Sequence, residues 1–192
     1  MRTLLVYCHP DPTSYIAAVR AATLDGLQRG GHEVRVTDLY AESFQPALTA
    51  VEHAAAVPGV GADLQRYVDD LLWCESLVLV YPTWWAGQPA MLKGWVDRVW
   101  ANGVAFDRPA NGNIIRGRLR NIRRITVVTT HGSSKFVNAL EGEAGKRTVS
   151  RSLRLMCSRR CRARWIALYT IDRSTLEQRE TFLRRVTRLL AR

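Results

Sequence analysis

The stretch TLLVYCHPDPTSYIAAVRAATLDGLQRGGHEVRVTDL, residues 3–39, carries the clearest structural signal in the sequence. Residues 3–8 are apolar or β-branched and predict a strand, which the prolines at positions 10 and 12 bring to an end. Apolar residues then recur at helical spacing from Ile16 to Leu27, and Gly30 and Gly31 provide a C-terminal stop. Residues 34–39 predict a second strand. A strand, a turn, a helix and a strand within about forty residues are typical of a right-handed crossover in a parallel sheet.

The same alternation continues along the rest of the sequence. Further strands are predicted at residues 76–81, 125–130 and 165–170, and further helices at 63–73, 91–100, 146–157 and 175–190, the last with Ser174 as its N-cap. Five strands alternating with five helices predict a doubly wound α/β domain, and we expect one domain over residues 1–192. Two loops, 40–62 and 101–123, are longer than usual, and such loops in a compact α/β domain are more often functional than accidental.

The composition and the lack of long apolar runs are typical of a globular domain that does not span a membrane. It has 192 residues, of which 47% are hydrophobic and 23% charged, as a globular domain needs in order to bury a core. The first apolar run is too short for a signal peptide, and no later run reaches the length of a membrane span. We therefore expect a cytoplasmic protein.

Basic charge is concentrated in the second half of the chain. The formal net charge is +11; residues 1–100 carry 7 basic and 11 acidic side chains, whereas residues 101–192 carry 21 and 6. Such asymmetry is compatible with a nucleic-acid surface, an anionic membrane surface or the attraction of phosphorylated ligands. Because nearly all of the cations are arginine, we prefer a compositional bias in which most of them decorate solvated helix faces.

The four cysteines, Cys8, Cys74, Cys157 and Cys161, do not indicate a disulfide framework. Two of them lie in apolar contexts where a reduced thiol acts as a small hydrophobe. Cys157 and Cys161 lie in the segment CSRRC, where neighbouring guanidinium groups could lower a thiol pKa. Their spacing is not Cys-x-x-Cys and no further Cys or His completes a ligand set, so we expect no metal site.

The first of three candidate ligand-binding segments follows the first predicted strand. Open α/β sheets bind ligands beyond the carboxyl ends of their strands. The backbone amides around residues 13–16 lie at a helix N-terminus, where they favour a phosphate, and the hydroxyls of Thr13 and Ser14 add donors. The segment has neither the dinucleotide-binding glycine fingerprint nor a P-loop motif, so an ordinary helix cap is an equally good interpretation.

The other two candidate segments follow the third and fourth predicted strands. The segment YPTWWAGQPA, residues 81–90, exposes an apolar surface that a flat ring system would cover, although for Trp84 and Trp85 taken alone we prefer a plug of the core or of a dimer interface. The segment TTHGSS, residues 129–134, offers hydroxyls and a glycine that lets a ligand approach the backbone closely. Three such segments at one end of a sheet point to a ligand site more strongly than any one of them.

Together these motifs resemble the flavodoxin-like NAD(P)H:quinone oxidoreductase family. The resemblance rests on His9-Pro10 with Thr13–Tyr15, on YPTWWAGQPAMLKGWVDRV at 81–99, and on TTHG at 129–132. It covers the whole chain in element order and implies a flavodoxin-like five-stranded parallel sheet of order 2-1-3-4-5 with helices on both faces. The chain is most similar to the compact bacterial quinone reductases and to the ancillary subunits of glutathione-gated potassium efflux systems.

The resemblance implies a flavin cofactor, FMN or FAD, held by the three segments. The first segment would bind the flavin phosphate, the second would lie along one edge and face of the isoalloxazine ring, and the third would lie at the other edge. The implied residues are His9, Thr13, Ser14, Tyr15, Ile16, Pro82, Thr83, Trp84, Trp85, Ala86, Thr129, Thr130, His131, Gly132 and Ser133.

The sequence departs from the family pattern in several places. His131 stands where the family usually has a second glycine, and Ile16 stands where it often has an asparagine. Phe136, Val137 and Glu143 occupy the region in which mammalian members carry a Tyr and a His implicated in proton handling, so that role is not transferred. The larger members also have a C-terminal extension that this chain lacks, which favours FMN over FAD.

The implied reaction is a two-electron, ping-pong hydride transfer from NADPH or NADH through the flavin to a quinone-like acceptor. Backbone N–H groups of His131 and Gly132 would stabilise negative charge on the reduced ring, and His131 could add a proton or a positive charge. The basic second half could favour NADPH by attracting its 2′-phosphate. No other residue is given a catalytic role.

The same fold and cofactor leave other functions open. The acceptor could be an azo or nitro compound, and the chain could be a flavin-binding regulatory subunit docked on a membrane potassium efflux system through its basic half. A one-electron flavodoxin is disfavoured because such carriers are normally acidic, and nucleic-acid binding rests on charge alone. The resemblance also implies a homodimer, whose contact we expect at the tryptophan-rich loop and residues 101–123.

Overall fold

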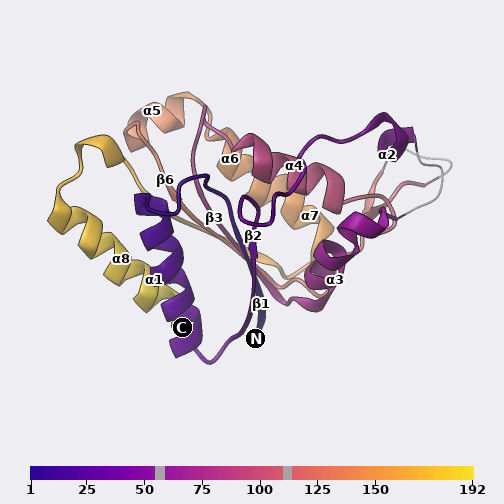
Figure 1. The fold of residues 1–192 in the computed structure, drawn as a ribbon, viewed down its shortest axis with the longest axis horizontal. Coiled ribbons are helices and arrows are strands. Elements are labelled where there is room, and N and C mark those ends of the chain that lie inside the picture. The colour runs from indigo at the N-terminus through magenta and orange to yellow at the C-terminus, as the bar shows by residue number, and fades with distance from the viewer. Residues whose placement is uncertain (55–58, 110–113) are drawn as a thin grey trace.

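The computed structural model describes residues 1–54, 59–109 and 114–192 and is drawn in Figure 1. A five-stranded parallel sheet runs through it in the order β2-β1-β3-β6-β7. Its strands are β1 (Arg2–Tyr7), β2 (Glu33–Asp38), β3 (Ser76–Pro82), β6 (Arg124–Thr130) and β7 (Arg162–Leu168). With these five strands counted in chain order, the sheet has the order 2-1-3-4-5, and the predicted flavodoxin-like, doubly wound α/β fold is confirmed.

Helices cover both faces of the sheet (Figure 1). On one face lie α1 (Tyr15–Arg29) and α8 (Leu176–Leu190); on the other lie α3 (Gln65–Trp73), α4 (Ala90–Val99) and a continuous helical segment made of α6 (Ala144–Arg147), the π-helical η2 (Thr148–Leu153) and α7 (Arg154–Met156). The smaller elements are α2 (Ala50–Ala54), α5 (Lys135–Leu140), the 3-10 turns η1 (Ala62–Leu64) and η3 (Ile171–Arg173), and the antiparallel pair β4 (Phe106–Asp107) and β5 (Arg116–Gly117). None of the helices in the described ranges is long and apolar enough to cross a membrane.

The core divides into two apolar clusters, one on each face of the sheet. Successive side chains of a strand point to opposite faces, so Leu4 and Val6 pack with α3 and α4, whereas Leu5 and Tyr7 pack with α1 and α8. The strand β3 is buried along its first six residues, as the continuous apolar run at 76–81 predicts. Each fully buried Leu or Val contributes about 1.5–3 kcal/mol, so the central strands hold the sheet rigid beneath its rim.

Strand β7 begins three residues earlier than predicted, at Arg162, and ends at Leu168 instead of Thr170. Arg162 and Arg164 break the apolar pattern by which the strand is predicted. Both are exposed, and β7 is the edge strand of the sheet, paired with β6 alone among the described strands. Thr170 ends the strand because its φ of 55° lies in the left-handed region.

The sequence patterns do not predict α2, α5 or the β4–β5 pair, because elements this short give too few positions for a periodicity. The helix α2 and the β4–β5 pair belong to the two long loops predicted at 40–62 and 101–123. Residues 55–58 and 110–113 of those loops lie outside the described residues.

The long loop before α3 is held by Arg98 of α4, a residue that the sequence analysis does not single out. Its buried guanidinium donates to Gln45 O at 2.6 Å, to Glu52 Oε1 at 2.5 Å and to Asp63 Oδ2 at 3.0 Å. The hydrogen bond from Arg98 lowers the pKa of Glu52 to about 2. One buried cation therefore ties three points of the loop to α4.

All four cysteines are buried and free. Burial raises the pKa of Cys8 and of Cys74 to about 12. The Cys157 thiol donates to Leu153 O at 3.4 Å, and its interaction with the Cys161 thiol raises the pKa of Cys157 and lowers that of Cys161. Each of the four belongs to the core cluster that α3 and α4 cover, so they pack as small apolar residues.

The N-cap of α8 is Thr175, and the prediction of Ser174 is wrong by one residue. The Thr175 hydroxyl accepts a hydrogen bond from Gln178 N at 3.2 Å, and Gln178 Oε1 accepts one from Thr175 N at 2.9 Å, which makes a capping box. The Ser174 hydroxyl instead donates to Ile171 O at 2.7 Å and closes the preceding turn. Both residue types cap helices well, and the glutamine three residues later selects Thr175.

We expect Thr175→Ala to lower the free energy of unfolding by about 1 kcal/mol, because it leaves the Gln178 N–H without its acceptor. Thr175→Ser keeps a hydroxyl at the same position and should stay within about 0.5 kcal/mol of the parent. Urea unfolding followed by circular dichroism measures both values. Equal losses in the two variants would contradict the capping box.

Candidate functional site

The carboxyl ends of β1, β3 and β6 lie side by side because these strands are parallel and adjacent. The segments that follow them, residues 8–14, 83–89 and 131–134, leave the sheet at the same edge, in the region between the first turn of α1 and α5 in Figure 1. The ring centroids of His9 and Trp84 are 6.0 Å apart, and Thr83 N donates to Thr130 O at 2.8 Å. All three candidate segments therefore border one rim.

The second segment forms a tight turn that presents a tryptophan to solvent. Trp84 and Gly87 exchange two backbone hydrogen bonds, of 3.2 and 3.0 Å, around Trp85 and Ala86. The φ angles of Trp85 and Ala86 are 48° and 57°, a conformation that such turns usually reserve for Asn-Gly. Trp85 is fully exposed. Left-handed residues other than glycine cost about 1–3 kcal/mol each and cluster at ligand clamps and active sites, which makes this turn a candidate binding element.

The tight turn is anchored from behind by the segment that begins at α6. Gly145 N donates to Ala86 O at 2.9 Å, and the Gln88 side chain donates to Gly145 O at 3.1 Å. A Cβ added at Gly145 would lie 3.3 Å from Ala86 O, so the glycine permits the close approach. Gly145 thus holds the turn at Ala86 and, through the Gln88 side chain, just after Gly87.

A cavity of about 610 Å³ opens between this turn, the segment after β6 and α5. Its volume lies in the range of small-molecule sites. It is lined by Thr83, Trp84, Trp85, Ala86, His131, Gly132, Ser133, Asn138, Glu141 and Asp172. A second cavity, of about 490 Å³, is lined by residues of α2, α4 and their loops and lies away from the strand ends.

The first segment, residues 8–14, has hydrogen-bond donors for an anion, but some of them already donate to groups within the segment. The N-cap of α1, Ser14, makes no side-chain hydrogen bond to the helix, so its hydroxyl leaves the first amides of α1 uncapped. Asp11 Oδ1 accepts from both the N–H and the hydroxyl of Thr13 at 2.7 Å, and these bonds lower the pKa of Asp11. The Tyr7 hydroxyl, at the end of β1, is buried and has no hydrogen-bond partner among residues 1–54, 59–109 and 114–192. The segment therefore keeps unsatisfied polar groups at a helix N-terminus, as a phosphate site would.

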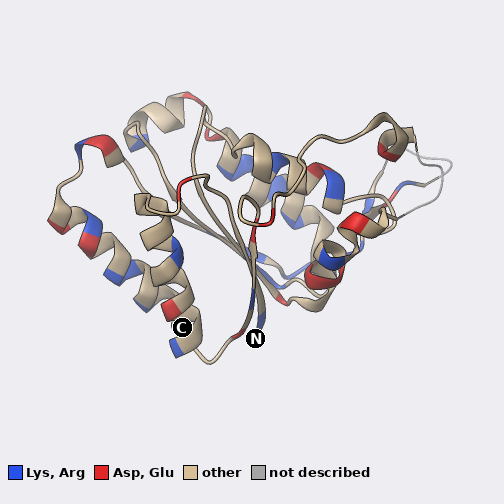
Figure 2. Cartoon of the chain, viewed as in Figure 1, with Lys and Arg blue, Asp and Glu red and all other residues tan. Residues whose placement is uncertain are grey.

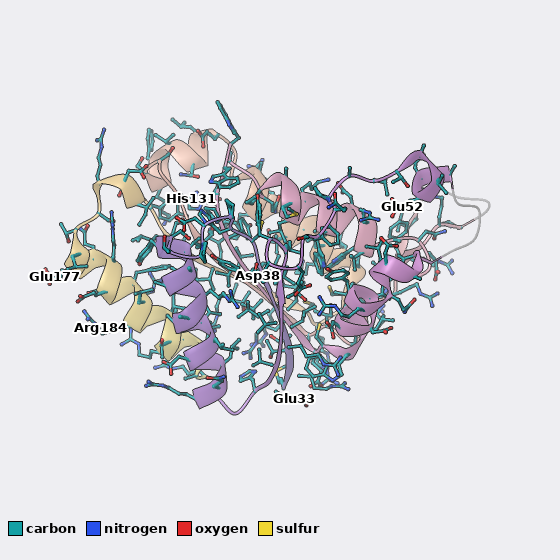
Figure 3. All side chains as sticks on the ribbon, viewed as in Figure 1. Glu33, Asp38, Glu52, His131, Glu177 and Arg184 are labelled. Carbon is teal, nitrogen blue, oxygen red and sulfur yellow. The ribbon has the colours of Figure 1, made fainter. Side chains whose placement is uncertain are left out.

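The third segment places His131 in the wall of the cavity. Its ring is 6% exposed, stacks on Tyr169 with centroids 4.6 Å apart, and holds Nε2 at 3.4 Å from Thr83 Oγ1. Thr83 Oγ1 is also 3.0 Å from Thr129 Oγ1. Figure 3 labels His131 at the rim, below α5. The three side chains form one short polar chain behind the tight turn.

Two features of His131 differ from the sequence-based expectation. Its backbone N–H donates to Leu168 O at 2.8 Å, so the predicted role of this amide as a donor to the flavin is wrong. Burial lowers the pKa of the ring, which favours the neutral imidazole over the predicted positive charge. Gly132 is exposed beside it, and a Cβ there would lie 2.9 Å from Asp172 Oδ2.

The structure divides the predicted site residues into two groups. Seven of them line the cavity: Thr83, Trp84, Trp85, Ala86, His131, Gly132 and Ser133. The rest lie outside the lining: His9 in the loop after β1, Thr13, Ser14 and Tyr15 at the start of α1, Pro82 at the end of β3, and the buried Ile16, Thr129 and Thr130. The buried side chains of Ile16 and Thr129 leave only their backbones for a ligand.

Three lining residues, Asn138, Glu141 and Asp172, were not predicted. Asn138 and Glu141 belong to or follow α5, and Asp172 lies in η3 after β7. The rule that places ligands beyond strand ends also applies to the segment after β7, and it is the one signal that points to Asp172. No group of three His, Cys, Asp or Glu residues suited to a metal occurs in the described ranges.

Comparison with known proteins identifies the family. The chain matches the flavodoxin-like fold family over residues 1–190. It belongs to the flavodoxin-like NAD(P)H:quinone oxidoreductase family. The structure of an NAD(P)H:quinone oxidoreductase from Methanothermobacter marburgensis superposes with a TM-score of 0.84 at 25% identity and covers 100% of this chain and 96% of that one.

Curated relatives share part of their length with this family member. NAD(P)H dehydrogenase (quinone) 1 of Cavia porcellus is 30% identical over 162 residues, which cover 75% of this chain and 58% of the relative. An uncharacterized NAD(P)H oxidoreductase of Haemophilus influenzae is 35% identical over 123 residues, which cover 63% of this chain and 60% of the relative. The chain thus spans about three fifths of the length of the curated relatives it matches.

The burial of His131 gives a direct test of its charge. We expect its imidazole to titrate below the ordinary histidine value of about 6.5, because the buried ring loses hydration when it gains a proton. Histidine resonances followed by NMR against pH give the midpoint, with His131→Gln for the assignment and the urea-unfolded protein as reference. A midpoint at or above the unfolded value would restore a cationic role.

Proposed function

We propose that this chain is a flavin-dependent NAD(P)H:quinone oxidoreductase, with the flavin ring and its acceptor placed in the cavity behind the tryptophan turn. One observation carries the proposal: a strained turn holds a fully exposed tryptophan beside a cavity of about 610 Å³ at the carboxyl end of the sheet. Exposed aromatic surface at a concave site suits a flat ring. Membership of the quinone oxidoreductase family supports the reaction type.

The residues present fit a flavin. The uncapped first amides of α1 would hold its phosphate, which competes with Asp11 for the amide and hydroxyl of Thr13. Trp84, Trp85 and Ala86 would border the ring on one side, and the exposed backbone of Gly132 would border it on the other. When bound, the flavin, FMN or FAD, supplies the hydride chemistry between NADPH or NADH and the acceptor.

We assign His131 a positioning role. As a neutral ring 3.4 Å from Thr83 Oγ1, it orients the threonine hydroxyl at the cavity wall without adding charge. Tyr169 fixes the plane of the imidazole from the other side. Glu143, in the region where mammalian relatives carry a proton-handling histidine, is instead paired with Lys146 at 2.8 Å.

The flavin proposal is tested on the purified protein. We expect a yellow protein, or a colourless one that takes up a flavin nucleotide when titrated, with the flavin identified by chromatography after release. Initial rates with NADH or NADPH and a quinone should then give the parallel double-reciprocal lines of a ping-pong reaction. A protein that binds neither FMN nor FAD would overturn the proposal.

Trp85→Ala provides the sharper form of this test. We expect the Kd for the flavin to rise about tenfold, since an aromatic contact contributes about 0.5–1.5 kcal/mol beyond its buried area. Leu176→Ala removes a similarly exposed apolar side chain from the start of α8 and should leave the Kd unchanged. Fluorescence titration gives both constants, and an unchanged Kd in Trp85→Ala would remove the turn from the site.

We also propose that the chain forms a homodimer. Ile114 and Ile115, on the described part of the loop 101–123, are 79% and 50% exposed, and Leu155 of α7 is 65% exposed. A second copy that covers them would remove this apolar surface from water. Ile115→Asp should shift the protein toward a monomer in sedimentation velocity, whereas Leu176→Asp should not; a wild-type protein that is monomeric at high concentration contradicts the dimer.

A further inference from the structure

The cavity of the proposed site carries a charge opposite to that of the protein. The chain has a formal net charge of +11, yet the only charged side chains among the described residues that line the cavity are Glu141 and Asp172. Figure 2 shows Lys and Arg spread over both helical layers, so the acidic lining is a local feature. A small number of charges that converge on a ligand site sets which ligand charges it accepts.

The geometry keeps both carboxylates available to a ligand. Asp172 lies in η3, where Ile171 N donates to His131 O at 3.0 Å, and its Oδ2 is 2.9 Å from the position that a Cβ on Gly132 would take. Within residues 1–54, 59–109 and 114–192, neither Asp172 nor Glu141 takes part in an ion pair or a side-chain hydrogen bond. The lining charge is therefore not cancelled within the described chain.

The nearby cations do not neutralise this pair. Lys146 is bonded to Glu143 at 2.8 and 2.9 Å. Lys135 and Arg173 are exposed, and neither lines the cavity. The described residues that line the cavity therefore include two carboxylates and no Lys or Arg.

Independent features mark this cavity as a ligand site. His131 is 6% exposed in its wall, and its Nδ1 is buried without a hydrogen-bond partner in the described structure. On the opposite side, the strained turn holds Trp85 in full exposure. Strained residues of this kind cluster at ligand clamps, and the acidic pair lines the same cavity as the turn.

We propose that Glu141 and Asp172 select the electron acceptor by its charge, so that neutral or cationic planar aromatic acceptors are used and anionic ones, such as sulfonated quinones, are disfavoured. The inference rests on the proposed function, because it concerns the acceptor of that same cavity. Two carboxylates about 8 Å from a ligand charge in a water-like medium disfavour an anion about fivefold at low salt. The effect should shrink when the ionic strength is raised, since both carboxylates reach solvent.

The test compares 1,4-naphthoquinone with 1,4-naphthoquinone-2-sulfonate as acceptors of the flavin-loaded protein. The two quinones differ in redox potential, so the informative quantity is the ratio of their kcat/KM values in each variant. In the double variant Glu141→Gln with Asp172→Asn, we expect this sulfonate-to-neutral ratio to rise about fivefold at low salt, and the rise should largely vanish at 0.5 M NaCl. Isothermal titration of each quinone against the oxidised protein gives the same ratio from dissociation constants, without turnover.

A matched control has the same change in net charge at remote positions. Glu33→Gln with Glu177→Gln removes two exposed carboxylates that Figure 3 labels on the strand β2 and the helix α8, outside the cavity lining. We expect its ratio to equal that of the parent. A ratio that does not change in the cavity variant, or that changes equally in the control, overturns the proposal.

The proposed function and the proposed charge selection can fail separately. A protein that binds flavin and reduces quinones with an unchanged ratio leaves the proposed function standing and removes only the charge selection. A protein that binds no flavin overturns the proposed function, and the selection of its acceptor falls with it.

Discussion

The parallel register of the sheet is the constraint from which the rest of the structure follows. Tyr81 pairs with Thr129 and Pro82 with Thr130, and the ladder continues by one bond, Thr83 N to Thr130 O, before the chain leaves the sheet. Because parallel strands end at the same edge, the segments after β1, β3 and β6 have to share one rim. Each segment is then shaped by local chemistry: prolines in the first, left-handed residues in the second, and a glycine in the third.

The rim combines stiffness with stored strain. Beneath it, β3 is buried along almost its whole length, so the strand ends cannot shift independently. Above it, Trp85 and Ala86 hold a conformation that Asn-Gly would adopt at lower cost. An Asn-Gly turn would make the fold more stable but would lose the aromatic surface. The Trp85-Ala86 turn therefore lowers the stability of the fold and provides an aromatic surface on which a flat ligand can bind.

The sequence predicts the parts of the fold that have a period and misses the parts that do not. The five strands and the main helices follow from apolar runs and helical spacing, whereas α2, α5 and β4–β5 are too short to show either. Within the candidate site, two of the sequence motifs, residues 83–86 and 131–133, line one cavity. The motifs cannot show that the His131 N–H is hydrogen-bonded to Leu168 O, or that the Asp172 carboxylate lies beside Gly132. Both contacts join segments about forty residues apart in the sequence.

Two of the chain's many arginines lie on the edge strand β7, where their charge has a physical effect. Arg162 and Arg164 stand exposed at the free border of the sheet, where the outward backbone groups offer a template for another strand. A second β7 laid against this border would bring guanidinium groups close to guanidinium groups, and their repulsion opposes the pairing. The strand thereby resists open-ended growth of the sheet from molecule to molecule, a protection against aggregation that an apolar strand at this border would not have.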